Sequence, residues 1–229
     1  MTRATLLVLT SLALMTGTAA AQVSRETADA WNSYVMAVSD RPSAIASTPH
    51  GTLVHIPGGS IYHSTGSTLI RNATVERVLA ALMHPGIPPP QQDVLESRVL
   101  WRGDRSLRVY LRLARTSIVT VEYDTEHQVT FTRHSPVMAT SRSESVRIVE
   151  RGGRDRGFLW RLNSYWRYTQ IGRDVRVDLE SLSLSRGVPP VARAMARPIA
   201  ERIAHDSLRR TLSAVQRFLQ TATQPAAGV

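Results

Sequence analysis

The sequence predicts an α+β fold in which a curved antiparallel sheet of about seven strands packs against one long C-terminal helix. Three observations lead to this prediction. Residues 93–185 form six segments of alternating apolar and polar side chains, separated by short turns. Residues 189–219 carry an apolar stripe at helical spacing. A strand and a helix precede the six segments, and an extra helix is expected near the N-terminus.

The first 21 residues are typical of a secretory signal peptide. Arg3 gives a basic start, residues 4–15 form an apolar run too short to span a bilayer comfortably, and residues 19–21 are alanines. We expect cleavage before Gln22 and a periplasmic or secreted mature chain. The remaining parts expected are an N-terminal helix with a Pro-rich linker, a folded domain and a disordered tail, covering 22–58, 59–220 and 221–229.

The composition excludes several classes of function. The chain has no cysteine, which excludes thiol catalysis and cysteine-based metal sites. The formal net charge is +10, but the 28 basic residues, all arginine, are scattered along the chain. Nucleic-acid binding favours a clustered basic stripe, so we do not expect it. Scattered arginine is compatible with solvated surface charge or with an anionic membrane surface as a partner.

The N-terminal part is predicted to contain two helices and a strand. Four apolar side chains recur at helical spacing over 27–40: Trp31, Tyr34, Val35 and Val38. Prolines break up the following linker, which has at most a short extended piece over 53–56. A first strand is expected over 60–70, and a helix over 74–84 that Pro85 ends.

The second part of the chain is predicted to be a strand meander followed by a helix. The expected strands cover 94–102, 106–113, 118–131, 137–150, 157–170 and 174–185. Short connections favour antiparallel neighbours, because parallel strands need long crossovers. The final helix is expected over 189–219, with a kink or a restart at Pro198, which cannot donate a backbone hydrogen bond.

The segment 157–168, GFLWRLNSYWRY, is the most informative part of the chain. Strand alternation places on one face Phe158, Trp160, Leu162, Ser164, Trp166 and Tyr168. A wide aromatic wall with one small polar group is typical of a hydrophobic ligand pocket. A well-packed sheet core is the other interpretation of the same pattern.

With these elements in this order, the chain resembles the START-like or SRPBCC superfamily. Its helix-grip fold is shared by lipid-transfer START domains, the birch pollen allergen family and polyketide cyclases. The resemblance covers roughly 59–220 and is carried by GFLWRLNSYWRY (157–168), VTVEYDTEH (119–127) and PPVARAMARPIAERIAHDSLRRTLSAVQRFL (189–219). These segments look like an exported bacterial branch that brings no established reaction. The resemblance implies a hydrophobic ligand in a cavity between the sheet and the C-terminal helix.

The predicted ligand contacts come from three parts of the chain. The aromatic strand, its neighbouring strands and the C-terminal helix contribute Trp160, Leu162, Ser164 and Trp166; Val109, Leu111, Val121 and Tyr123; and Met195, Ile199 and Ile203. Each of these residues could instead belong to a filled core. No nucleophile elbow, phosphate-binding loop or dinucleotide pattern is present in the sequence, and we expect no catalytic residue, metal or cofactor.

Two polar groupings are candidate metal sites, and the spacing argues against both. Alternation places Glu122, Asp124 and Glu126 on one strand face and His127 on the other, which favours a row of outer-face ion pairs over a cation site. Three histidines near the linker match no compact zinc-ligand spacing: His50, His55 and His63.

The leading functional hypothesis is an exported carrier or sensor that binds a hydrophobic molecule, such as a lipid or an isoprenoid-like compound, without catalysis. One alternative is a cyclase, hydratase or hydrolase on the same scaffold, which an ionisable group inside the cavity would favour. Another is a ligand-free interaction module of the cell envelope, which a fully packed core would favour. The sequence leaves open the ligand, the oligomeric state and the role of the 27–40 helix.

Overall fold

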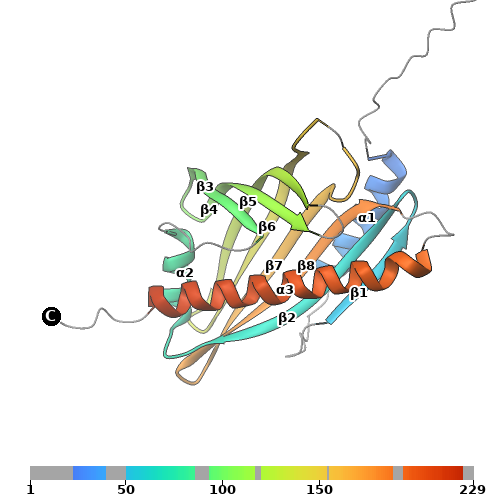
Figure 1. Cartoon of the computed structure of the whole chain (residues 1–229). Helices are drawn as coiled ribbons and strands as arrows, with labels where there is room; N and C mark the ends of the chain where they lie inside the picture. Colours follow the sequence, from blue (N-terminus) through green and yellow to red (C-terminus); the bar gives the residue numbers. More distant parts are fainter. Residues whose placement is uncertain are drawn as a thin grey trace, which may run out of the picture.

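The computed structural model describes residues 23–39, 50–85, 93–116, 120–153, 155–187 and 193–223. Figure 1 shows one curved, open antiparallel sheet, whose strands follow the order β1-β2-β8-β7-β6-β5-β4-β3. The strands are β1 His50–Ile56, β2 Gly59–Ile70, β3 Val94–Arg102, β4 Ser106–Thr116, β5 Thr120–Ser135, β6 Met138–Glu150, β7 Arg161–Ile171 and β8 Asp174–Arg186. The helices are α1 Arg25–Ser39, α2 Val75–Met83 and α3 Arg193–Thr223.

The predicted α+β fold with a long C-terminal helix is confirmed, and the sheet has eight strands where about seven were expected. The additional strand is β1, which lies in the predicted linker. It pairs with β2 along its whole length, from His50 opposite Thr65 to Ile56 opposite Gly59. The sheet therefore begins at His50, before the domain boundary predicted at Gly59.

The strand β7 begins later than the predicted start at Gly157. Gly157 has a φ of 73°, in the left-handed region that favours glycine, so the chain turns here and is not yet extended. Beyond this turn Phe158 is 56% exposed and Leu159 is buried, the reverse of the predicted alternation. Regular alternation starts only at Arg161, where pairing with β8 begins.

The helix α3 continues through Pro198 as one element, so the predicted restart is not found. Its later turns are held by packing, because Leu208, Leu212 and Leu219 are all buried. Arg210 also donates from Nε to the Asp93 carboxylate, at 3.1 Å, just before β3. Since α3 packs along β2 as well, it bridges the concave side of the sheet (Figure 1).

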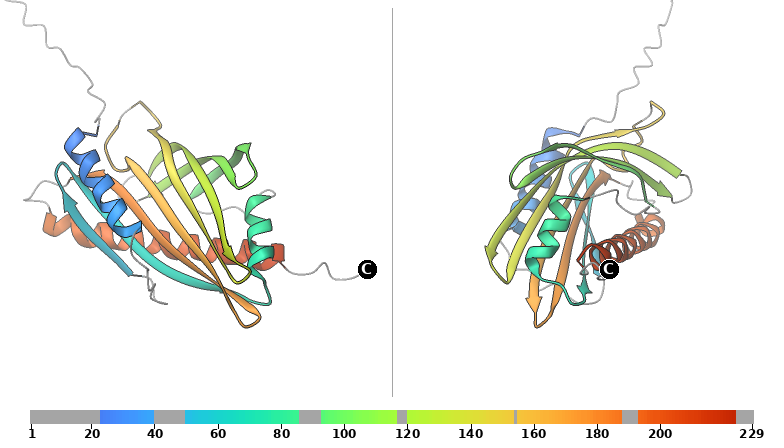
Figure 2. Two further views of the ribbon diagram at one scale, coloured as in Figure 1. Left: turned by 180° about the vertical axis from the view of Figure 1, so that it is seen from behind. Right: turned by 90° about the vertical axis from the view of Figure 1, so that its left-hand side faces the viewer.

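The helix α1 lies on the opposite, convex face of the sheet (Figure 2). Its buried side chains Trp31 and Val38 pack with Ile61, Leu182 and Leu184 of β2 and β8. The predicted apolar stripe of this helix is thus confirmed. Because α1 and α3 cover different faces, α1 is not a second cover over the concave side.

A hydrogen-bonded chain also fastens α1 to the sheet. The Tyr34 hydroxyl lies 2.8 Å from Nδ1 of His63, and Nε2 of His63 lies 2.7 Å from the Glu180 carboxylate. Near the start of the helix, the Thr27 hydroxyl donates to the Pro57 carbonyl at 2.8 Å. Polar and apolar contacts together therefore fix the position of the helix.

The strand β3 forms one edge of the sheet and is irregular. Its pairing with β4 shifts register between Val94 and Glu96 and again between Val99 and Trp101. Three of its large apolar side chains are about half exposed: Leu95, Leu100 and Trp101. This edge therefore differs from the regular ladder in the middle of the sheet.

Replacing Trp31 with alanine should lower the free energy of unfolding by about 3 kcal/mol, because the indole is buried and its loss leaves a cavity under α1. The matched control is Met36→Ala, on the same helix but 66% exposed, which should change stability by less than about 0.5 kcal/mol. Urea denaturation of both variants measures the difference. Equal effects would show that α1 is not packed as described.

Candidate functional site

A row of serines crosses the middle of the concave face. Strand register places Ser64 of β2 opposite Ser181 of β8, Ser181 opposite Ser164 of β7, and Ser164 opposite Ser143 of β6. Paired residues share a face of the sheet, so the four hydroxyls lie side by side and point toward the α3 side. We call these four residues the serine row.

The described buried apolar side chains on this face form clusters on either side of the serine row. At the α2 end lies the Tyr168 cluster, with Ile70, Val75, Val78, Leu107, Phe131, Tyr168, Val175, Val177 and Leu219. At the other end lies the Tyr123 cluster, with Leu113, Val121, Tyr123 and Leu159. A domain of this size usually has one contiguous core. Among the described residues, the two clusters do not merge across the serine row.

Seven of the predicted ligand contacts lie on this face. Leu111 and Leu162 pack against the Tyr123 cluster, which contains Val121 and Tyr123 themselves. Trp166 contacts both the Tyr168 cluster and Leu179, Leu208 and Leu212. Val109 packs against the Tyr168 cluster, and Ser164 is part of the serine row. Several of these side chains are only half-buried: Val109, Leu111, Leu162, Ser164 and Trp166.

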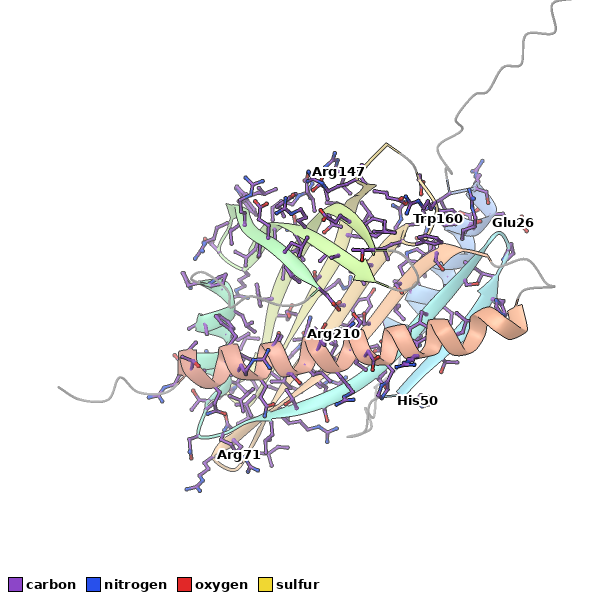
Figure 3. All side chains as sticks on the ribbon, in the orientation of Figure 1. Glu26, His50, Arg71, Arg147, Trp160 and Arg210 are labelled. Carbon is purple, nitrogen blue, oxygen red and sulfur yellow. The ribbon has the colours of Figure 1, made fainter. Side chains whose placement is uncertain are left out.

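Trp160 does not share this face, so its predicted position is wrong. It precedes β7 and is labelled in Figure 3. It packs with the convex-face residues around Trp31 under α1. The physical reason is the turn at Gly157, which shifts the alternation before the strand begins. The buried indole Nε1 of Trp160 has no hydrogen-bond partner among the described residues. The other three predicted contacts, Met195, Ile199 and Ile203, belong to α3, and their side chains lie outside the described part.

Alternation predicts His127 on the strand face opposite the acidic row, and His127 is not among the predicted ligand contacts. It lies on the concave face, opposite Val109 of β4 and Ser145 of β6, and is 3% exposed. Its Nε2 lies 3.1 Å from the hydroxyl of Thr125, which itself donates to the Leu111 carbonyl at 3.0 Å. Thr125 therefore accepts from Nε2–H, and the lone pair of the neutral ring is on Nδ1.

Burial lowers the pKa of His127 to about 4, because the charged imidazolium would lose its hydration. The ring is therefore neutral at physiological pH. A neutral imidazole is able to accept a proton or a hydrogen bond, and it stands on the same face as the serine row.

A sequence signal for the polar part of this face does exist. Serines recur at every second position in 141–145 and again in 181–185, which is the spacing of one strand face. His127 directly follows Glu126 in the strand, so the two side chains point to opposite faces of the sheet. The side chain of Glu126 lies on the convex face. Period-two serines identify the face, but only the strand register aligns them into a row.

The acidic row on the convex face forms ion pairs, as predicted. Arg151 lies 3.0 Å from Asp124 and 3.8 Å from Glu122, while Glu126 pairs with Arg108 at 3.4 Å. The Tyr110 hydroxyl donates to Asp124 at 2.7 Å and, with Arg151, holds the pKa of that carboxyl below its usual range. These charges stabilise the surface of the sheet and do not face α3.

The three histidines near the linker are not brought together. His63 bonds Tyr34 and Glu180, whereas His55 lies 3.2 Å from the Ser60 hydroxyl and His50 lies 3.4 Å from that of Thr52. Within the described ranges no three histidine or acidic side chains gather into a group that could hold a metal ion. In the same part of the chain, no helix combines the length and apolarity needed to span a bilayer.

No family model matches the sequence, and no curated protein sequence matches it either. Solved structures do share its fold. A protein from Thermus thermophilus has a TM-score of 0.54 at 15% identity, over 71% of this chain and 99% of that one. The STAR-related lipid transfer protein from Xanthomonas axonopodis has a TM-score of 0.52 at 19% identity, over 74% and 98%.

A third structure of this kind is the Zhui aromatase/cyclase from a Streptomyces species, with a TM-score of 0.52 at 14% identity, over 74% of this chain and 99% of that one. Identities this low establish the fold and not the activity. The expected START-like, helix-grip fold is thereby confirmed.

The buried His127 predicts a specific loss of stability in acid. Its folded-state pKa of about 4 lies below the usual value of 6.5, so below pH 6.5 the unfolded chain takes up a proton that the folded protein does not. The penalty grows as the pH falls from 6.5 to 4 and reaches about 3 kcal/mol. Above pH 6.5 it is absent.

Urea denaturation at pH 7 and pH 4.5 measures this penalty, and His127→Asn should remove it. His134→Asn, which changes an exposed histidine on the same strand, should keep the acid sensitivity of the wild type. Histidine NMR gives a second measurement that needs no variant. A His127 ring that takes up its proton near pH 6.5 would contradict the described burial.

Proposed function

We propose that the protein is an exported, non-catalytic carrier or sensor that binds a hydrophobic molecule between the concave face and α3. The observation that carries this proposal is the set of half-buried apolar side chains in the middle of the concave face. Val109, Leu111, Leu162 and Trp166 keep accessible surface in the middle of the face, although packing would normally bury such side chains. A bound apolar molecule would complete the core there.

Burial of apolar surface would supply the affinity. At about 25 cal/mol per Å², a ligand that buries ~300 Å² gains a gross ~7 kcal/mol before the entropic cost of binding. A similarly folded structure is named a STAR-related lipid transfer protein, which supports a lipid or isoprenoid-like ligand as the first class to test.

The proposed cellular setting rests on the predicted leader and on the charge. Residues 1–21 would direct export, and the scattered arginines, with a formal net charge of +10 for the whole chain, would favour approach to anionic membrane surfaces. A carrier of apolar molecules has to meet a membrane to load or release them. Flotation with anionic and neutral vesicles separates this approach to membranes from ligand binding between the concave face and α3.

Material extracted from protein purified from the periplasm should contain a hydrophobic compound that mass spectrometry detects at a fixed ratio to protein. Ser164→Phe fills the middle of the face and should reduce that occupancy at least about tenfold, since a phenyl ring would overlap the ligand. Thr130→Phe adds the same ring to an exposed position on the convex face and is the matched control.

Protein that is always empty and binds nothing in a panel of lipids would overturn the carrier proposal. That outcome would favour the third hypothesis, a ligand-free module of the cell envelope.

One observation favours an enzyme as the second candidate. His127 is a buried, neutral base on the concave face, the kind of ionisable group that distinguishes a catalytic cavity from a carrier. The Zhui structure is named an aromatase/cyclase, so this scaffold accommodates such chemistry in another protein. If the extracted compound is converted on incubation and His127→Asn abolishes the conversion without releasing the compound, the enzyme proposal replaces the carrier.

A further inference from the structure

The serine row differs from two neighbouring serines of the concave face, Ser141 and Ser145, whose hydroxyls have hydrogen-bond partners. Ser141 lies 2.8 Å from the Tyr168 hydroxyl, and Ser145 accepts from the backbone N–H of Leu162 at 2.9 Å. These two side chains therefore make hydrogen bonds within the fold itself. The side chains of the serine row, Ser64, Ser181, Ser164 and Ser143, have no recorded hydrogen bond within the described residues.

The position of the serine row makes its hydroxyls available to a ligand. Ser64 is only 4% exposed, and the other three members of the row are half-buried. In the described part of the chain, none of the four hydroxyl oxygens is a fully buried atom without a partner. A ligand that held only hydrocarbon would take water away from these hydroxyls when it covered them, at a cost of about 1–3 kcal/mol for each, whereas alanine at the same positions would carry no such cost. Four such hydroxyls in register indicate hydrogen-bonding groups on whatever lies above them.

His127 is a second, independent observation at the end of the row. Its cross-strand partner is Ser145, and its neighbour Val129 pairs with Ser143, so His127 lies diagonally beyond the serine row. It is 3% exposed, and only one ring nitrogen has a recorded partner, the Thr125 hydroxyl. The other ring nitrogen is an acceptor without a partner in the described part of the chain.

The spacing of these groups sets the length of the polar line. Neighbouring strands lie about 4.8 Å apart, so hydroxyls on four adjacent strands extend over about 14 Å. This is longer than a single polar head group. Apolar side chains flank the line on both sides, with Trp166 and Leu179 toward α2 and Leu162 toward the Tyr123 cluster.

We infer that the ligand is an elongated apolar molecule with several oxygen substituents along one edge, and not an unsubstituted acyl chain. This inference rests on the proposed function and specifies its ligand class. Hydroxyl or carbonyl oxygens of the ligand would bond the serine row, and a ligand hydroxyl would donate to Nδ1 of His127. The carbon skeleton would pack against Trp166 and Leu162. Serine suits these positions for two reasons. Its side chain is small enough to leave room for a ligand, and its hydroxyl can hydrogen-bond an oxygen of the ligand.

The test compares two planar probes of nearly equal size, quercetin, which carries hydroxyls around its rings, and flavone, which is the same ring system without them. A fluorescent stearate represents an acyl chain. Isothermal titration of the full-length mature protein should give an affinity for quercetin at least about tenfold higher than for flavone, since two or three hydrogen bonds distinguish them.

A triple variant assigns that preference to the serine row. Ser143→Ala, Ser164→Ala and Ser181→Ala together should weaken quercetin binding more than flavone binding and reduce the ratio of the two affinities to within about twofold. Ser67→Ala, which removes a hydroxyl from the convex face of β2, should keep the wild-type ratio. Circular dichroism verifies that each variant is folded, and the comparison on wild type needs no variant.

Each outcome has a distinct meaning. Binding of flavone or stearate to the wild type as tightly as quercetin would overturn this inference while supporting a carrier of plain apolar molecules. A triple variant that keeps the full preference for quercetin would also overturn it. If none of the three probes binds, the proposed function fails and the inference fails with it.

Discussion

The pairing of β2 with β8 is the constraint on which the rest of the structure depends. It joins the first long strand to the last one, from Gly59 opposite Arg186 to Ile70 opposite Val175. Both helical layers use it, because α1 packs on its convex side and α3 on its concave side. A slip of one residue would exchange the two faces of β8 and bring Leu182, now under α1, to the side of α3. The register thus decides which residues can meet a ligand.

The two faces of the sheet use different chemistry. On the convex face, arginines and carboxylates form ion pairs across β4, β5 and β6, which are partly solvated and contribute little stability each. On the concave face, apolar clusters at the two ends enclose hydroxyls and one neutral histidine. The exposed charges explain much of the arginine content without any reaction. On the concave face, by contrast, packing alone does not explain the hydroxyls and the histidine among the apolar side chains.

The sequence was sufficient for the order of the elements and for most of the faces. β3 has the predicted bounds, and the apolar stripe of α1 packs against the sheet as its spacing indicated. Two local errors have physical causes. β1 was predicted only as a short piece because prolines flank it, and its stability comes from pairing with β2. Trp160 was placed on the wrong face because Gly157 turns the chain.

The alignment of Ser64, Ser181, Ser164 and Ser143 could not be predicted from alternation, since these residues come from four separate strands and meet only through register. The same applies to His127. Alternation predicts the strand face on which it lies but not the residues of other strands beside it. At this site the sequence predicts which residues share a face of each strand. It does not predict the register that brings residues of different strands together.

The irregular edge strand β3 has a consequence for the behaviour of the chain in concentrated solution. An open sheet presents unpaired backbone groups at its edges, and a straight edge with exposed Leu95, Leu100 and Trp101 would invite another copy to add a strand. Two bulges interrupt the straight run of β3, and Arg98 and Arg102 place charge along it. This combination lets the edge carry apolar side chains without offering a template for fibrous self-assembly.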